Sequence, residues 1–168
     1  MRIFNETQRF TQWWLLLINI ALLFLMLYSC YTWLVLKDAV GNVAADDRVG
    51  QTIFILVIAL VIPLIYVFNL KTTIDEIGIH YQFIPINFSK KIIRWHEIEK
   101  CFVRKYSPIR EYGGWGYRGL SGKNKALNVK GNKGIQLVLK NGNKLLIGTQ
   151  KENDAKMVIE RYFKIKNE

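Results

Sequence analysis

Hydrophobic residues follow two patterns along the chain. They form uninterrupted runs in the first 70 residues and alternate with polar residues after that. Residues 13–36 and 52–70 form two apolar runs without a charged side chain. A helix of roughly 20 apolar residues spans the hydrocarbon layer of a bilayer, and at about 1.5 Å per residue these runs reach roughly 36 and 28 Å. The sequence therefore predicts two membrane-spanning helices.

A polar segment, residues 37–51, separates the two runs and is long enough to connect antiparallel helices, which would return the chain to its starting side. The basic residues near the runs are Arg2, Arg9 and Lys71 on the side of the termini, and Lys37 and Arg48 in the connection. Because basic residues near membrane spans favour the cytoplasmic side, we expect a multi-pass protein of the plasma or inner membrane with both termini in the cytoplasm.

Aromatic residues mark the ends of the first run. Trp13 and Trp14 stand at its start, and Tyr31 and Trp33 near its end. Amphipathic rings collect at the headgroup levels of a bilayer, so these four residues are predicted interface anchors. Neither run carries the ionisable groups that proton relays or voltage sensors need, and the hairpin is therefore interpreted as an anchor.

Alternation after residue 70 indicates strands with one buried face. It predicts strands over residues 77–83, 91–95 and 98–106, and a hairpin of residues 135–139 and 145–147 around a two-residue type I′ Asn141-Gly142 turn. Thr149 and Glu152 match a helix capping box, and apolar residues recur at helical spacing from Ala155 to Phe163. We predict a hairpin domain over residues 1–70 and, over residues 71–168, an α+β, mainly β domain: an antiparallel barrel or sandwich capped by a C-terminal helix.

Charge is concentrated in the second domain. Of the 24 Lys and Arg residues, 20 lie beyond residue 70, with nine Asp and Glu. A basic domain held at a bilayer meets anionic lipid at high effective concentration. Cations and aromatics interleave at Arg104, Tyr106, Arg110, Tyr112, Trp115 and Arg118. These residues are the candidate binding site for an anionic lipid headgroup or a membrane protein partner, whereas nucleic acid is not expected.

The same region contains a glycine pattern, because Gly114, Gly116 and Gly119 fit G-x-G-x-x-G. A dinucleotide site needs a buried strand before this pattern and a helix after it, but residues 120–134 are polar and rich in Lys and Gly. Two interpretations stay open. The stretch is either a turn with glycines at positive φ, in which Trp115 covers the end of the core, or a recognition surface.

The sequence contains no recognisable catalytic motif and no metal-binding motif. His80 and His96 have no second His or Cys at metal-ligand spacing, and Cys30 and Cys101 form no CxxC motif. We therefore expect no enzyme activity, no cofactor and no metal.

Several segments together carry a family resemblance: the strand 77–83, the segment Ile-Arg-Trp-His-Glu-Ile at 93–98, the glycine-aromatic stretch 112–119, the Asn-Gly hairpin and Gly-Thr-Gln at 148–150. Residues 72–166 resemble a bacterial pleckstrin-homology-like (PH-like) domain, a family that often follows two membrane spans. The resemblance implies fold and placement. Our hypothesis is a non-catalytic binding or assembly module at the membrane surface, and the alternative is a structural or regulatory subunit of a membrane protein complex.

Overall fold

The chain forms two compact units, of which the computed structural model describes residues 3–119 and 123–165. The helical unit is Thr11–Val67, and the β unit combines Met1–Phe10 with Phe68–Glu168. This division differs from the predicted one at residue 70, because the first ten residues join the β unit. The helical unit is therefore an insertion within the β unit. Arg2, used above to orient the chain, lies outside the described residues.

Two antiparallel helices make up the helical unit. Helix α1 (Trp13–Tyr31) continues into a π-helical turn, η1 (Thr32–Leu36), and α2 (Arg48–Val67) contains Pro63. Near one end of the pair the Asn19 side-chain amide donates a hydrogen bond to the Tyr66 hydroxyl at 2.7 Å. Near the other end the Trp33 and Phe54 rings meet edge to face at 5.5 Å.

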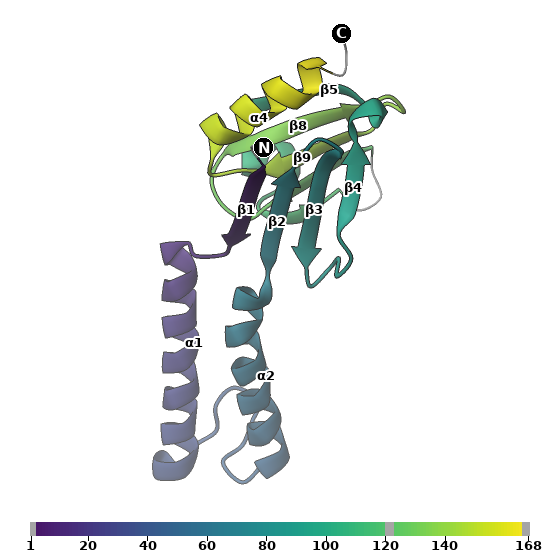
Figure 1. Ribbon diagram of the computed structural model, residues 1–168. Coiled ribbons are helices and arrows are strands. Elements are labelled where there is room, and N and C mark those ends of the chain that lie inside the picture. The colour runs from purple at the N-terminus through teal and green to yellow at the C-terminus, as the bar shows by residue number, and fades with distance from the viewer. Residues whose placement is uncertain (1–2, 120–122, 166–168) are drawn as a thin grey trace. The chain divides into compact units, whose positions relative to one another are not determined.

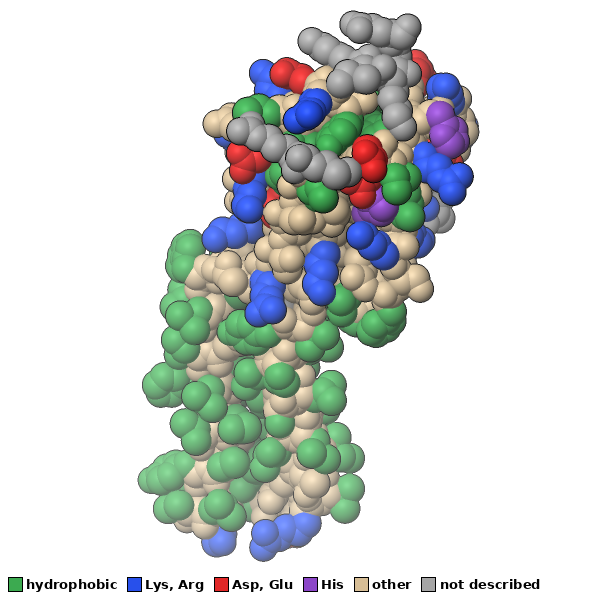
Figure 2. All heavy atoms as spheres, in the orientation of Figure 1, with side chains coloured by type: hydrophobic (Ala, Val, Ile, Leu, Met, Phe, Trp, Pro, Cys, Tyr) green, Lys and Arg blue, Asp and Glu red, His purple; other side chains and the backbone are tan. Residues whose placement is uncertain are grey.

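Apolar side chains cover the outside of the helical unit (Figure 2). The helical segment Trp13–Leu36 is long and apolar enough to cross a membrane, whereas the apolar segment Arg48–Leu64 of α2 is shorter than such a span. Length and composition thus identify one candidate span among the described residues, and not the two that the sequence predicted. An exposed apolar surface of this extent marks contact with a membrane or with other proteins.

The first sheet of the β unit is antiparallel, in the order β1-β2-β3-β4 (Figure 1). Its strands are β1 (Phe4–Arg9), β2 (Asn69–Ile74), β3 (Gly78–Ile84) and β4 (Lys91–Arg94). Strands β3 and β4 confirm sequence predictions, but β1 and β2 were not predicted. Arg9 pairs with Asn69, so the chain leaves the sheet for the helices and returns from them on neighbouring strands.

The second sheet is mixed, in the order β5-β8-β9-β7-β6. Its strands are β5 (Ile98–Lys105), β6 (Gly116–Arg118), β7 (Asn124–Asn128), β8 (Lys133–Leu139) and β9 (Lys144–Gly148). Because β7 and β9 run parallel, the prediction of a wholly antiparallel fold is wrong. The barrel is also wrong, since the strands form two separate sheets.

The β8–β9 hairpin is confirmed, but its turn is longer than predicted. The Leu139 amide donates to the Asn143 carbonyl at 2.8 Å, which leaves three residues in the loop. Gly142 has φ +79° and Asn141 does not have positive φ. A type I′ turn needs positive φ at both central residues, so this loop has the three-residue form with glycine in the left-handed position.

One core joins the inner faces of both sheets to helix α4 (Glu152–Ile165). Its largest fully buried side chain is Trp95, in the short 3₁₀ helix η2 (Trp95–Glu97). Thr149 and Glu152 do not form the predicted capping box, because the Thr149 amide donates to the Lys133 carbonyl at 2.9 Å and Glu152 pairs with the Lys133 ammonium. The Thr149 hydroxyl accepts the Lys151 amide at 3.1 Å and donates to the Glu6 carboxylate at 2.6 Å, which ties β1 to the start of α4.

Candidate functional site

The candidate site lies on the outer face of the second sheet. Side chains alternate between the two faces of a strand. Leu145 and Ile147 of β9 enter the main core, whereas Leu146 joins a separate small cluster with Tyr106 and Ala126. Both faces of this sheet are therefore covered in part, the inner face by the main core and the outer face by helix α3 (Pro108–Tyr112).

Helix α3 is short and is defined by its two ends. Pro108 occupies the first helical position, where a missing N–H costs nothing. Gly113 ends the helix in the left-handed conformation, at φ +70°, and its amide donates to the Ile109 carbonyl at 2.9 Å. The Glu111 carboxylate accepts the Ser107 amide at 2.8 Å. These contacts hold Glu111 and Tyr112 toward the sheet.

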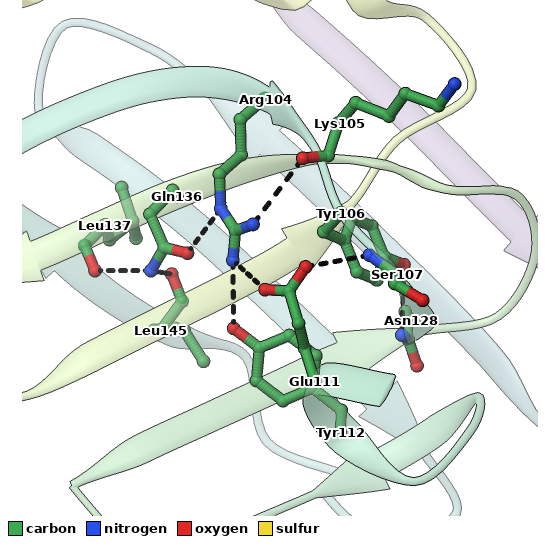
Figure 3. A network of polar contacts seen from close by, with 10 residues as sticks. All are labelled: Arg104, Lys105, Tyr106, Ser107, Glu111, Tyr112, Asn128, Gln136, Leu137 and Leu145. Atoms are coloured by element: carbon green, nitrogen blue, oxygen red, sulfur yellow. Dashed lines mark hydrogen bonds and ion pairs between the residues drawn. The ribbon is translucent and has the colours of Figure 1, made fainter. Parts of the chain in front are cut away.

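Arg104 of β5 joins α3 to the sheet (Figure 3). Its Nε donates to Gln136 Oε1 at 3.0 Å, and its Nη2 donates to Glu111 Oε2 at 2.7 Å and to the Tyr112 hydroxyl at 3.4 Å. We call Arg104, Glu111, Tyr112 and Gln136 the Arg104 clamp. Since most guanidinium donors are used inside the clamp, Arg104 is a connecting residue rather than an unoccupied anion site.

Tyr106 is a core residue of this face. Its side chain is 4% exposed, its hydroxyl accepts the Asn128 amide at 3.0 Å, and its ring packs edge to face on Tyr112 at 6.0 Å. Asn128 is fully buried and also accepts the Gly116 amide at 2.8 Å. Asn128 therefore links the buried tyrosine to the glycine-rich stretch that follows α3.

The electrostatics follow from these contacts. The hydrogen bond from Arg104 lowers the pKa of Glu111, which keeps this carboxylate charged. Burial raises the pKa of Tyr106, and this outweighs the opposing hydrogen bond from Asn128. The clamp is accordingly a charged pair beside a neutral tyrosine, and none of its groups is arranged as a nucleophile with a base.

The glycine-rich stretch runs from the end of α3 through the short strand β6 to Gly119. Gly114, Gly116 and Gly119 all have positive φ, and a Cβ on Gly119 would meet the Asn124 carbonyl oxygen at 2.1 Å. The half-buried Trp115 donates its indole N–H to the Gly131 carbonyl at 2.9 Å. Helix α3 precedes Gly114 and strand β6 lies between Gly114 and Gly119, whereas a dinucleotide site has a strand before its glycines and a helix after them. The positive φ values that the turn interpretation expected are present.

Arg110 and Arg118 are the two candidate residues that stay exposed. Arg118 donates from Nε to the Trp115 carbonyl at 3.1 Å. The structure thus brings Arg104, Tyr106 and Tyr112 together and joins Trp115 to Arg118 in a second group. Sequence reasoning missed Asn128 and Gln136. The only signal was a polar residue between apolar neighbours on a strand, which usually indicates solvent exposure.

An open groove of 440 Å³ lies beside the clamp on the same outer face. It is lined by the clamp residues together with apolar and polar side chains of the sheet: Phe102, Arg104, Glu111, Tyr112, Asn124, Gln136, Val138 and Lys144. The Phe102 side chain is 44% exposed. The groove offers an apolar surface with charged groups of both signs around it, a combination suited to binding a peptide segment.

The predicted membrane anchors differ in exposure. Trp13, Trp14 and Tyr31 are 73%, 37% and 54% exposed within the chain, so their rings are available to lipid. Trp33 is 2% exposed and donates its indole N–H to the Val43 carbonyl at 3.2 Å. Its burial between α2 and the connecting loop gives Trp33 a packing role and does not fit that of an interface anchor.

Comparison with protein families, curated proteins and solved structures finds no match to this chain. Within residues 3–119 and 123–165, no group of three or more His, Cys, Asp and Glu side chains is placed to hold a metal ion. The buried His80 instead has its Nε2 2.8 Å from Asp75 Oδ2.

Proposed function

We propose that this chain is an integral membrane protein in which α1 and α2 cross the bilayer as a hairpin. The β unit, a PH-like domain, then acts at the cytoplasmic surface as a non-catalytic module that binds a membrane protein partner or anionic lipid. The proposal combines the apolar helical unit with the groove on the outer face of the second sheet.

The observation that carries the membrane hairpin is the pairing of β1 with β2. Strands that pair lie on the same side of a membrane, so the chain between Arg9 and Asn69 crosses an even number of times. If α1 crosses, α2 must return. Helix α2 has 20 residues, which at about 1.5 Å per residue reach roughly 30 Å, the thickness of the hydrocarbon core.

Charge supports a cytoplasmic β unit. Arg9 and Lys71 flank the helices on the β-unit side, and the β unit carries most of the basic residues of the chain. Basic segments favour the cytoplasmic side and are attracted to its anionic lipids. The same charge would keep the groove close to the membrane surface, where a partner's juxtamembrane segment is concentrated.

Membrane topology can be tested with single cysteines in the full chain carrying Cys30→Ala. Thr7→Cys and Asn141→Cys report on the β unit, and Asn42→Cys on the connection between α1 and α2. The native Cys101 stays silent, because burial raises its pKa to about 12. A membrane-impermeant maleimide should label Asn42→Cys in intact cells and the other two only after lysis. Labelling of Thr7→Cys and Asn42→Cys from the same side would contradict the hairpin.

The groove is tested by affinity purification of the full chain in mild detergent. Phe102→Glu places a charge on the exposed apolar surface of the groove, and Ile77→Glu, at a residue 52% exposed elsewhere on the β unit, is the matched control. A protein partner of the groove should be lost with Phe102→Glu and retained with Ile77→Glu. Flotation of the β unit without its helices, with Phe10 joined to Phe68 through Asn-Gly, in anionic and in neutral liposomes tests lipid binding.

The alternative proposal is a structural or regulatory subunit whose helices pair with other membrane subunits. The extensive exposed apolar surface of α1 and α2 favours it, because protein can cover that surface as well as lipid. In this case a partner stays bound to Phe102→Glu and is lost when exposed apolar residues of α1 are replaced.

A further inference from the structure

The loop between β3 and β4, residues 85–90, presents apolar side chains to solvent. Phe88 is 73% exposed and Ile86 is 47% exposed. No other large hydrophobic side chain among the described residues of the β unit is more exposed than Phe88. Burying such a side chain in an apolar environment is worth roughly 1.5–3 kcal/mol, so its exposure on an ordered loop calls for a partner.

Hydrogen bonds fix the backbone of this loop. The Asn87 amide donates to the Phe83 carbonyl at 2.7 Å, and the Gln82 side-chain amide donates to the Phe88 carbonyl. These bonds connect the loop to Gln82 and Phe83, near the end of β3. Both apolar side chains point out of the core. The exposure of Ile86 and Phe88 is therefore a consequence of an ordered loop backbone.

The loop lies at the end of the first sheet where the chain enters and leaves the helical unit. Arg9 of β1 pairs with Asn69 of β2, and Asn69 pairs with Ile84 of β3, the residue before the loop. Phe10, the last residue before the helical unit, and Phe68, the first residue after it, have ring centroids 6.2 Å apart.

Positive charge surrounds the same end of the sheet. Arg9, Lys71, Lys90 and Lys91 are all exposed. No acidic residue occurs between residues 77 and 96. An aromatic ring flanked by cations matches the composition of segments that enter the headgroup region of an anionic membrane.

We infer that the β3–β4 loop inserts Phe88 and Ile86 into the headgroup region of the bilayer that the helices cross, with Lys90 and Lys91 against anionic headgroups. The inference rests on the proposed membrane hairpin. The β unit is already joined to the hairpin by two chain segments, at Phe10–Thr11 and at Val67–Phe68, and the loop would attach it to the membrane at a third point. Two connections that leave neighbouring strands act as a hinge. An attachment on β3–β4 would restrict rotation about that hinge and give the β unit a preferred orientation on the membrane.

The test uses the full chain with Cys30→Ala, reconstituted in liposomes that contain nitroxide-labelled lipid. An environment-sensitive fluorophore is attached at Phe88→Cys. The matched control is Ile77→Cys in the β2–β3 turn, which is also exposed but lies at the opposite end of the same sheet. The five residue steps of β3 from Ile79 to Ile84 separate the two ends by about 17 Å. Leu23→Cys, within α1, reports separately on membrane crossing.

At position 88 the expected result is a shift of emission to shorter wavelength and a loss of intensity with shallow nitroxides, both absent at position 77. Position 23 should lose intensity with deep nitroxides. Quenching at 23 but not at 88 overturns the loop insertion and leaves the hairpin intact. Absence of quenching at 23 overturns the hairpin itself, and equal quenching at 88 and 77 overturns the specific role of the loop.

Discussion

Arg9 and Asn69 face each other across the antiparallel pair of β1 and β2, although the whole helical unit, Thr11–Val67, lies between them in the chain. This pairing makes the β unit discontinuous in sequence. It also means that the β unit has a natural closing point, because Phe10 and Phe68 would form the next pair of the same ladder.

We expect the helical unit to be replaceable by a tight turn. Joining Phe10 to Phe68 through Asn-Gly supplies the two-residue type I′ loop that antiparallel strands favour. This version should give a folded, water-soluble β unit, whereas a fragment beginning at Lys71 should not, because it lacks all of β1 and the start of β2. Dispersion of amide NMR signals and thermal unfolding compare the two. A cooperative transition of the fragment at the same temperature would contradict the role of β1.

Glu6 should be important for the stability of the β unit. It is 6% exposed and accepts hydrogen bonds from the Thr149 hydroxyl at 2.6 Å and the Gln150 amide at 2.7 Å. Glu6→Ala leaves both donors without this partner, which should cost about 2 kcal/mol of unfolding free energy. Urea unfolding of the chain in detergent can measure the loss through labelling of Cys101. Thr7→Ala, at an exposed position on the same strand, should change stability little.

The pair of Arg104 and Glu111 should stabilise the fold only while the carboxyl is charged. Its pKa in the folded state lies below the ordinary value of 4.5. The contribution is therefore fully present above about pH 4.5 and is lost as pH falls through the folded pKa. Wild type and Glu111→Gln should differ by less than about 1 kcal/mol at neutral pH, as exposed pairs do, and should converge in acid. A difference that grows as pH falls would contradict this assignment.

Trp115 separates the structural from the recognition interpretation of the glycine-rich turn. Trp115→Phe keeps a large ring but removes the indole donor to the Gly131 carbonyl. A structural role predicts a loss of about 1 kcal/mol in unfolding free energy without a change in co-purifying partners or liposome binding. Arg110→Ala, at an exposed residue of α3, should leave stability unchanged. Loss of binding in Trp115→Phe at unchanged stability would identify a recognition residue.

The sequence predicted the parts of the fold that local pattern determines. The apolar run of α1, strands β3 and β5, the β8–β9 hairpin and helix α4 all follow from hydrophobic period. Strand β1 was missed because Glu6 and Gln8 occupy its buried positions. Their burial depends on Thr149 and Gly148, about 140 residues away in the chain. Strand β2 was missed because Leu70 continues the apolar run of α2 without a break.

The candidate site shows the same limit. Alternating cations and aromatics singled out Arg104, Tyr106 and Tyr112, which the structure brings into contact, and their role in binding stays a prediction. The pattern did not reveal that Arg104 is occupied by Glu111 and Gln136, because Gln136 belongs to a different strand. A charge read from sequence is counted as available for a ligand until its partner on another element is known.

The discontinuous β unit also sets an order of events during synthesis. Strand β1 leaves the ribosome before β2. It stays unpaired until the helical unit and β2 have been made. Pairing across such a separation is slow, because the intervening chain must be brought back before any contact forms. Inserted into a membrane, the chain would complete its first sheet only after both helices had settled with their ends on one side. A molecule with one helix misplaced would keep β1 and β2 apart, with exposed strand edges that quality-control proteases and chaperones recognise.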